Sequence, residues 1–306
     1  MKILLATSKP FAKAAVDGIR SVVEGAGHEL VLLEKYSQKQ SLLKAVVDVE
    51  AIIIRSDIID SEVFSAAKKL RIVVRAGAGY DNVDLETATA NGVCVMNTPG
   101  QNANAVAELV FGLLVYAARN FYNGTSGYEL MGKKLGIHAF GNVGRSVARI
   151  AKGFGMEVFA YDAYCSNDYI EQCGVTPLDS VESLYKTCQI VSLHLPATAE
   201  TINSIDMTLL ANMPMQAVLI NTARKEVINE EHLIKFMKER EDFKFLTDIQ
   251  PAALGKFQEL FTDRYFSTPK KMGAQTAEAN NNAGIAAANQ IVGFFRDGVT
   301  KYQVNK

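Results

Sequence analysis

Residues 135–162 read LGIHAFGNVGRSVARIAKGFGMEVFAYD, and this stretch decides the fold. A short apolar run is followed by a turn of small residues, a stretch with helical periodicity, a second apolar run and a terminal aspartate, Asp162. This order predicts a dinucleotide-binding βαβ unit. In such a unit the small residues let the backbone approach a pyrophosphate, the helix N-terminus offers free N–H groups, and the carboxylate binds ribose hydroxyls.

The fingerprint departs from its usual form at one position. Ala139 takes the place of the first glycine, so the motif reads A-x-G-x-x-G with Gly141 and Gly144 in register. Asp162 follows Gly144 by 18 residues, and the next residues, AYCSND, include no Lys or Arg. A carboxylate here repels the 2′-phosphate of NADP, so the sequence predicts NAD as the cofactor. The candidate contacts are Gly141, Asn142, Val143, Gly144 and Asp162.

The composition is typical of a globular protein. The 306 residues, 48% of them apolar and 21% charged, suffice for two domains with separate cores. The 32 basic and 33 acidic residues give a net charge of −1, which lacks the positive excess that non-specific nucleic-acid binding requires. We therefore expect no nucleic-acid partner.

The cysteines and the N-terminus exclude other classes. Cys94, Cys165, Cys173 and Cys188 show neither metal-ligand nor redox-pair spacing, so we expect reduced thiols and no metal. The N-terminus, MKILLATSKP, predicts a first strand and not a signal peptide. No apolar run approaches the length of a membrane span, and we expect a cytoplasmic protein without a membrane partner.

Strand-like and helix-like segments alternate on both sides of the fingerprint. The strand-like runs are KILLAT, ELVLLE, AIIIRS, RIVVRAG and VCVMNT before it and IVSLHLP, AVLINT and FKFLTD after it. This rhythm predicts parallel strands with crossover helices, in two tandem α/β units. The apolar residues 102–120 predict a helix that packs between domains or subunits. We expect the small-residue helix after Thr276 to return to the first unit.

Several motifs follow the order found in the D-2-hydroxyacid dehydrogenases. They are IIIRS (52–56), VRAGAGYDNVDL (74–85), VMNTPGQNANAVAE (95–108), the fingerprint, VSLHLPATAET (191–201) and INTARKEVINEEHL (220–233). The chain thus resembles the phosphoglycerate dehydrogenase branch of that family, in a short form without the regulatory domain of longer relatives. The resemblance implies a flavodoxin-like substrate-binding domain at residues 1–98 and 280–306, and a Rossmann NAD-binding domain at residues 99–279.

The resemblance also assigns substrate contacts. Arg224 of the N-x-A-R motif would bind the substrate carboxylate and carbonyl oxygen, a task that suits a planar guanidinium. Arg55 and Arg75, each at a strand end, are candidates for a substrate phosphate, and a simple ion pair is the alternative for either. The turn at residues 76–79 would offer backbone N–H groups to a carboxylate, or is merely a tight turn. Further implied substrate contacts are Ser56, Ala76, Gly77 and Asn102.

Other positions are implied to contact the cofactor. Asp248 matches the aspartate that bonds the nicotinamide carboxamide. His194 belongs to a stretch that flanks the cofactor, where a histidine is more often a structural neighbour than a proton carrier. The remaining implied contacts are Ala78, Val106, Leu195, Pro196, Thr222, Ala223 and Gly273.

The acid–base pair of the family is absent. Its glutamate and its histidine have no counterpart in TDIQPAALG (247–255) and STPKKMGAQTAEA (267–279). The Thr-Pro pair places the histidine position at Lys270, whereas counting back from GAQTAEA places it at Lys271, so both are candidates. A lysine, with an intrinsic pKa of about 10.4, is an acid at neutral pH without a glutamate partner. The alternative is a pair of solvated surface lysines.

The implied function is NAD-dependent oxidation of D-3-phosphoglycerate to 3-phosphohydroxypyruvate, in serine biosynthesis, by a homodimer. The alternatives are a glyoxylate or hydroxypyruvate reductase and a non-catalytic NAD(H)-sensing protein similar to corepressors of this fold. Two further departures from the family are Lys225, which replaces a glycine, and the short segment at residues 120–132, in a region that relatives use for dimer contacts.

Overall fold

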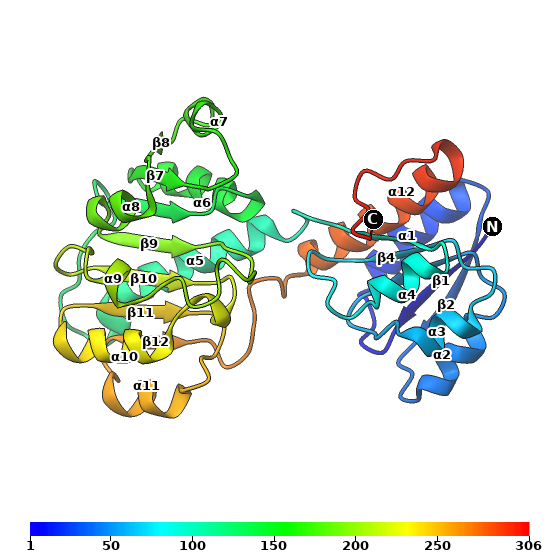
Figure 1. Cartoon of the computed structure of the whole chain (residues 1–306), viewed down its shortest axis with the longest axis horizontal. Coiled ribbons are helices and arrows are strands. Elements are labelled where there is room, and N and C mark those ends of the chain that lie inside the picture. The colour runs from blue at the N-terminus through cyan, green and yellow to red at the C-terminus, as the bar shows by residue number, and fades with distance from the viewer. Residues whose placement is uncertain (306) are drawn as a thin grey trace. The chain divides into compact units, whose positions relative to one another are not determined.

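The computed structural model describes residues 1–305, which form two compact units. Met1–Asn102 and the described part of Gln275–Lys306 make up the first unit, and Ala103–Ala274 make up the second (Figure 1). The first unit thus contains segments from both ends of the sequence. The predicted borders at residues 98/99 and 279/280 differ from these by four and five residues, since helix α12 (Ala277–Asp297) begins before residue 280.

The first unit is a parallel sheet with helices on both faces. Its strands, hydrogen-bonded in the order β2-β1-β3-β4-β5, are β1 (Lys2–Thr7), β2 (Glu29–Glu34), β3 (Ala51–Ile54), β4 (Ile72–Arg75) and β5 (Cys94–Asn97). Its helices are α1 (Lys13–Gly25), α2 (Lys39–Ala45), α3 (Ser61–Ala66), α4 (Leu85–Ala90) and α12. This strand order is the flavodoxin-like one.

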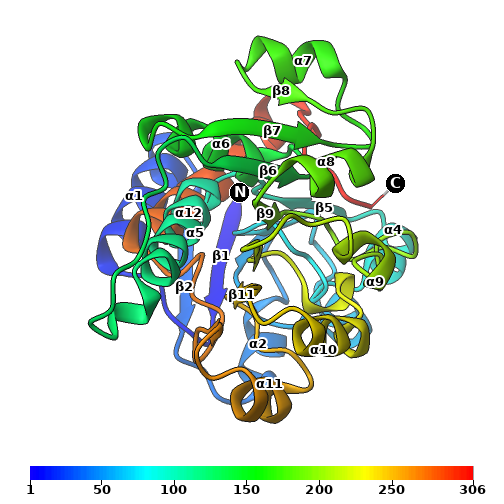
Figure 2. The same ribbon diagram turned by 90° about the vertical axis from the view of Figure 1, so that its left-hand side faces the viewer.

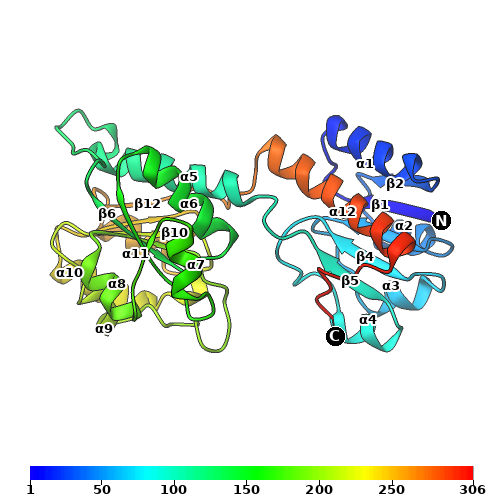
Figure 3. The same ribbon diagram turned by 90° about the horizontal axis from the view of Figure 1, so that it is seen from above.

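Both faces of this sheet are buried, which explains the continuous apolar runs. Ile3 and Leu5 of β1 belong to the core beneath α1 and α12, and Leu4 belongs to the core beneath α2, α3 and α4. In Figure 3, α1 and α12 lie side by side over one face. A Cβ on Gly284 would lie 2.9 Å from Ile19 Cδ1, so the small residues of α12 allow its close packing on α1.

The second unit is a larger parallel sheet. Its strands, in the order β12-β11-β10-β9-β6-β7-β8, are β6 (Lys134–His138), β7 (Glu157–Tyr161), β8 (Thr176–Pro177), β9 (Ile190–Leu193), β10 (Val218–Asn221), β11 (Lys244–Thr247) and β12 (Tyr265–Ser267). Its helices are α5 (Ala103–Ala118), α6 (Asn142–Gly153), α7 (Asn167–Gln172), α8 (Val181–Thr187), α9 (Met207–Leu210), α10 (Glu230–Glu239) and α11 (Leu254–Leu260), with 3₁₀ turns η1 (Asn120–Tyr122) and η2 (Lys225–Val227).

This topology is the Rossmann order extended by one strand, so the predicted class of two doubly wound α/β units is confirmed. The sequence rhythm did not reveal β8 and β12, which are edge strands of two and three residues. Within residues 1–305, no helix has both the length and the apolar character that a membrane crossing requires.

The expectation for the apolar helix at residues 102–120 needs correction. Helix α5 contributes Val110, Phe111 and Leu114 to a core shared with α6 and the sheet, so its apolar face is covered inside the second unit. Figure 2 shows α5 and α6 on one side of this sheet and α8, α9 and α10 on the other. The helix is highly apolar because it packs against both α6 and the sheet, at β11.

Candidate functional site

The strand order of the second unit reverses between β6 and β9, and ligands of such sheets bind at the carboxyl ends of the strands at this point. The fingerprint turn, residues 139–144, lies at the end of β6. Ala139 has a φ of 77°, in the left-handed region that favours glycine. The residue that replaces the first glycine therefore keeps the glycine conformation.

The two remaining glycines fit a dinucleotide. A Cβ on Gly144 would lie 2.5 Å from the Ala139 carbonyl oxygen, so this position serves the close packing of α6 on the turn. A Cβ on Gly141 would meet no atom within 4 Å. Gly141 is also the N-cap of α6 and has no side chain to cover the first N–H groups. This open helix N-terminus suits a pyrophosphate.

Asp162 fixes the surroundings of the turn. Its Oδ2 accepts a hydrogen bond from the Phe140 N–H at 2.6 Å, and its Oδ1 accepts from Tyr164 N–H at 2.8 Å and Cys165 N–H at 2.9 Å. The carboxylate thus joins the end of β7 to the fingerprint turn. It also lines the adjacent cavity, as a carboxylate that binds ribose hydroxyls must.

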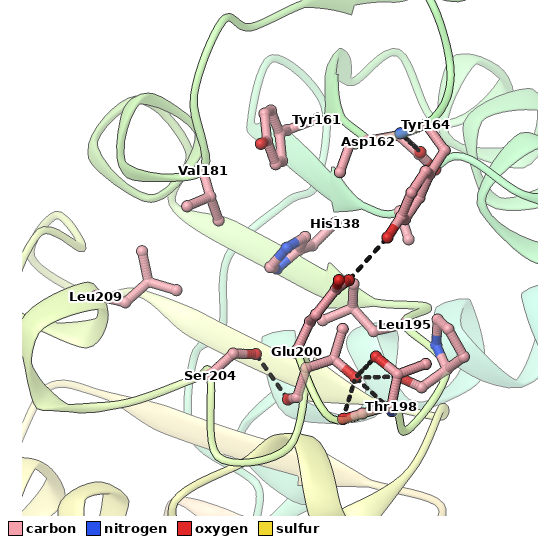
Figure 4. A pocket seen from close by; sticks show the side chains of 14 residues that line it. His138, Tyr161, Asp162, Tyr164, Val181, Leu195, Thr198, Glu200, Ser204 and Leu209 are labelled. Atoms are coloured by element: carbon pink, nitrogen blue, oxygen red, sulfur yellow. Dashed lines mark hydrogen bonds between the residues drawn. The ribbon is translucent and has the colours of Figure 1, made fainter.

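The cavity beside Asp162 has a volume of about 280 Å³ and lies entirely in the second unit (Figure 4). Its mostly apolar lining suits a planar base with an attached sugar. The lining residues are His138, Ala139, Tyr161, Asp162, Ala163, Tyr164, Val181, Leu195, Pro196, Thr198, Glu200, Thr201, Ser204 and Leu209. None of these is a Lys or an Arg, and this agrees with the prediction of NAD over NADP.

Two histidines lie at the ends of β6 and β9, the buried His138 and the half-buried His194. Burial lowers the pKa of His138 to about 4 and, together with the nearby His138, that of His194 to about 3. The backbone N–H of His194 donates to the backbone carbonyl oxygen of His138 at 2.9 Å. Because both rings are neutral at pH 7, neither is suited to donate a proton to a substrate.

Arg224 follows β10 in a turn that the Asn221 side chain stabilises with two hydrogen bonds to the backbone. Asn221 Oδ1 accepts from the Ala223 N–H at 2.9 Å, and its Nδ2 donates to the Arg224 carbonyl oxygen at 2.8 Å. In the described chain, no carboxylate lies within 4.0 Å of the Arg224 guanidinium, which donates to the Ala223 carbonyl oxygen at 2.9 Å. Thr222 and Ala223 are buried beneath this turn.

The lysine loop, residues 268–273, is fastened to Asp248 at the end of β11. Asp248 is fully buried, and its Oδ1 accepts from Thr268 Oγ1 and from the Met272 N–H, both at 2.8 Å. Its Oδ2 accepts from the Gly273 N–H at 2.8 Å. A Cβ on Gly273 would lie 3.0 Å from this carboxylate and 3.2 Å from Val106 Cγ2. The backbone of the loop at residues 272–273 therefore packs directly against the Asp248 carboxylate.

Lys270 and Lys271 are both exposed on this loop. Gln250 Nε2 donates to the Pro269 carbonyl oxygen at 3.0 Å, directly before Lys270. Since β10, β11 and β12 are neighbouring parallel strands, the segments that carry Arg224, Asp248 and the lysines leave the same edge of the sheet.

The first unit holds the other predicted residues. Arg55 and Arg75 lie at the carboxyl ends of the adjacent strands β3 and β4, and Arg75 Nε donates to the Arg55 carbonyl oxygen at 3.1 Å. A Cβ on Gly77 would lie 1.5 Å from Arg75 Nη1, so a larger residue would require the Arg75 side chain to move, and the φ of 148° at Gly77 also favours glycine. Of the remaining predicted positions in this unit, Ser56 and Ala78 are exposed, Ala76 is buried and Asn102 is half-buried.

Comparisons with known proteins agree with this geometry. The family model "D-isomer specific 2-hydroxyacid dehydrogenase, NAD binding domain" matches residues 114–263. The crystal structure of the NAD⁺-bound 3-phosphoglycerate dehydrogenase of Entamoeba histolytica is 46% identical, with a TM-score of 0.88, and the alignment covers 100% of this chain and 99% of that one.

Two curated relatives extend the comparison. The chain is 34% identical to the D-3-phosphoglycerate dehydrogenase of Methanocaldococcus jannaschii, over 87% of its own length but only 54% of the relative. It is 32% identical to the glyoxylate reductase of Thermococcus litoralis, over 95% and 94% of the two chains. The chain belongs to the D-2-hydroxyacid dehydrogenase family. These matches support NAD as its cofactor and the phosphoglycerate dehydrogenase branch as its place in the family.

Sequence reasoning missed three polar residues of this dehydrogenase. Asn221 holds the turn that presents Arg224, and its place in the N-x-A-R motif was the available signal. Tyr164 Oη donates to Glu200 Oε2 at 2.8 Å beside the cavity, and no local pattern connects residues so far apart in the sequence.

Within residues 1–305, no group of three or more His, Cys, Asp or Glu side chains is placed to hold a metal ion.

Proposed function

We propose that this chain is an NAD-dependent D-3-phosphoglycerate dehydrogenase that oxidises D-3-phosphoglycerate to 3-phosphohydroxypyruvate in serine biosynthesis. We further propose that it acts in the cytoplasm as a homodimer, which light scattering after size-exclusion chromatography would test. The observation that carries the substrate proposal is the environment of Arg55.

Arg55 is a half-buried cation with neutral partners. Its Nη2 donates to Asn280 Oδ1 at 2.6 Å, and its Nη1 lies 3.3 Å from the carbonyl oxygens of Lys9 and Pro10. In the described chain, no carboxylate lies within 4.0 Å of its guanidinium, which supports a role other than a direct ion pair. Burial lowers the pKa of Arg55, and the Coulombic attraction of the Asp57 carboxylate offsets only part of that effect. A dianionic phosphate would offset the rest, since buried charges are ordinarily paired.

Arg224 is proposed to bind the substrate carboxylate and carbonyl group. Its guanidinium can contact both the carboxylate and the carbonyl oxygen, and this polarises the C=O bond. When bound, NAD(H) supplies or accepts the hydride. Gly141, Asp162 and the residues of the adjacent cavity would hold it, as their geometry allows.

Lys270 or Lys271 is proposed as the proton donor. In the reductive direction the ammonium gives its proton to the substrate oxygen, the new O–H bond forms as the N–H bond breaks, and the amine regains a proton from water. In the oxidative direction the neutral amine must take the hydroxyl proton.

The decisive experiment compares NADH oxidation with 3-phosphohydroxypyruvate, hydroxypyruvate and glyoxylate. The wild type is expected to prefer the phosphorylated ketoacid, and Arg55→Ala or Arg75→Ala should lower its kcat/KM by about 10- to 100-fold with much smaller losses for hydroxypyruvate. Arg71→Ala is the control, because Arg71 precedes the amino end of β4 and lies over Phe295. Equal losses for both substrates would make these arginines structural.

A reductase of glyoxylate or hydroxypyruvate is the second candidate. The similarity to the Thermococcus litoralis glyoxylate reductase over nearly the whole chain favours it. Higher kcat/KM for an unphosphorylated ketoacid in the same assay would select it. No turnover of any of the three would favour the non-catalytic NAD(H)-sensing alternative.

A further inference from the structure

One hydrogen bond connects two segments beside the cofactor cavity. Tyr164 Oη donates to Glu200 Oε2 at 2.8 Å (Figure 4). Tyr164 follows Asp162 by two residues after β7, whereas Glu200 belongs to the segment that follows β9. Both residues line the 280 Å³ cavity, so their bond links its two sides.

The backbone fixes both ends of this link. The Tyr164 N–H donates to Asp162 Oδ1 at 2.8 Å, which places the tyrosine next to the predicted ribose-binding carboxylate. On the other side, Thr201 Oγ1 donates to the Pro196 carbonyl oxygen at 2.6 Å and accepts from the Thr198 N–H at 2.8 Å. The turn that carries Glu200 is therefore internally braced.

The link itself is exposed. The Tyr164 residue retains 87% of its accessible surface, so its ring is not held by a core. A single hydrogen bond exposed to water is weak, and such a bond opens readily to admit a ligand. The Glu200 carboxylate raises the pKa of Tyr164, so the phenol stays protonated and able to donate at neutral pH.

The charge of the cavity is one-sided. Asp162 and Glu200 are both carboxylates, and the described lining contains no Lys or Arg to offset them. His138, the histidine of the lining, is neutral at pH 7 because its pKa is about 4. A ligand with an additional phosphate on its ribose would meet two negative charges and not one.

We propose that Tyr164 and Glu200 form a latch across the cofactor cavity, in which the hydrogen bond slows cofactor release and the Glu200 carboxylate adds to Asp162 in rejecting NADP. Glu200 is then a specificity-determining residue that the fingerprint does not contain. Its charge and its hydrogen bond can be separated, because a glutamine keeps an acceptor oxygen but has no charge.

The test uses two variants of the full chain and measures binding, not turnover. NADH and NADPH are titrated by their fluorescence, and NADH release is followed by stopped flow. Glu200→Gln is expected to tighten NADPH binding by about 3- to 10-fold and to change NADH binding by less than about twofold. Tyr164→Phe is expected to leave the NADPH/NADH ratio of Kd values unchanged and to speed NADH release by about 3- to 10-fold.

Matched controls lie on α7. Glu171→Gln removes the same charge from outside the cavity lining, and Tyr169→Phe removes a phenol that does not line the cavity. Neither control should change the cofactor ratio or the release rate. An unchanged NADPH/NADH ratio in Glu200→Gln, or an unchanged release rate in Tyr164→Phe, overturns the proposal.

Discussion

Asp162 accepts a hydrogen bond from the Phe140 N–H of the fingerprint turn, and also from the backbone N–H groups of Tyr164 and Cys165. In the lysine loop, Asp248 accepts from two backbone N–H groups and the Thr268 hydroxyl. Each aspartate follows a strand, β7 or β11, and each holds a loop that departs from the family pattern.

The two departures have different consequences. In the turn the ligand is bound mainly by backbone, so Ala139 can replace glycine as long as it adopts the same φ of 77°. In the lysine loop the proposed chemistry depends on a side chain, so a lysine in place of the family's histidine would change the acid itself. A site built from backbone groups can thus keep its function after a substitution, whereas a site built from a side chain would need a new proton donor.

The largest expected effect is on the side-chain-built site. Arg224→Ala should lower kcat/KM for ketoacid reduction by about four orders of magnitude, because both the carboxylate and the carbonyl oxygen lose their partner. Arg224→Lys should recover little, since a point ammonium cannot hold both groups. Steady-state kinetics measures this, and fluorescence titration should show unchanged NADH binding. The control is Lys225→Ala, at the exposed neighbour, and a kcat/KM near that of the wild type in Arg224→Ala would refute the assigned role.

The lysines come next. If one of them is the proton donor, either Lys270→Ala or Lys271→Ala should lower kcat by roughly two to four orders of magnitude, and the other should change it little. Steady-state kcat of ketoacid reduction by the wild type, both single variants and the double variant measures this. If the double variant is as fast as the wild type, the proton comes from elsewhere.

Asp248→Asn tests whether that aspartate mainly holds the lysine loop. The amide cannot accept all three hydrogen bonds, so the free energy of unfolding should fall by about 2 kcal/mol and kcat by about tenfold. NADH affinity should change by less than about threefold. Asp206→Asn is a matched control, since Asp206 accepts one backbone hydrogen bond, from Leu209, as a helix cap. A large loss of NADH affinity with intact stability would instead support the carboxamide contact that the family resemblance implies.

The smallest effects separate the positions of the fingerprint turn. Ala139→Gly should raise the free energy of unfolding by about 0.5–1 kcal/mol, because it relieves a left-handed alanine. Gly141→Ala should leave stability nearly unchanged, since its Cβ would meet no atom within 4 Å, but should weaken NADH binding about tenfold, which is about 1.4 kcal/mol. Urea unfolding and fluorescence titration measure the pair. Destabilisation by Ala139→Gly would contradict the strain argument.

The sequence predicted the elements whose signals are local. The apolar runs before and after the fingerprint gave the main strands of both sheets, because a strand buried on both faces must be apolar along its length. The βαβ unit that binds the cofactor was also predictable from a local signal, the spacing of 18 residues from Gly144 to Asp162. The short strands β8 and β12 escaped, since two or three residues at a sheet edge carry too little pattern.

The arrangement of side chains around the site required the tertiary structure. Pairing of β10, β11 and β12 brings the ends of three strands to one edge, where Asp248 meets Met272 and Gly273 across more than 20 residues of sequence. The Tyr164–Glu200 contact and the hydrogen bond from Arg55 to Asn280 arise in the same way, between residues that no periodicity connects. Periodicity reports which residues are buried, and therefore determined the fold of this dehydrogenase. Contacts among polar side chains at strand ends depend on strand order, and therefore only the folded chain decided them.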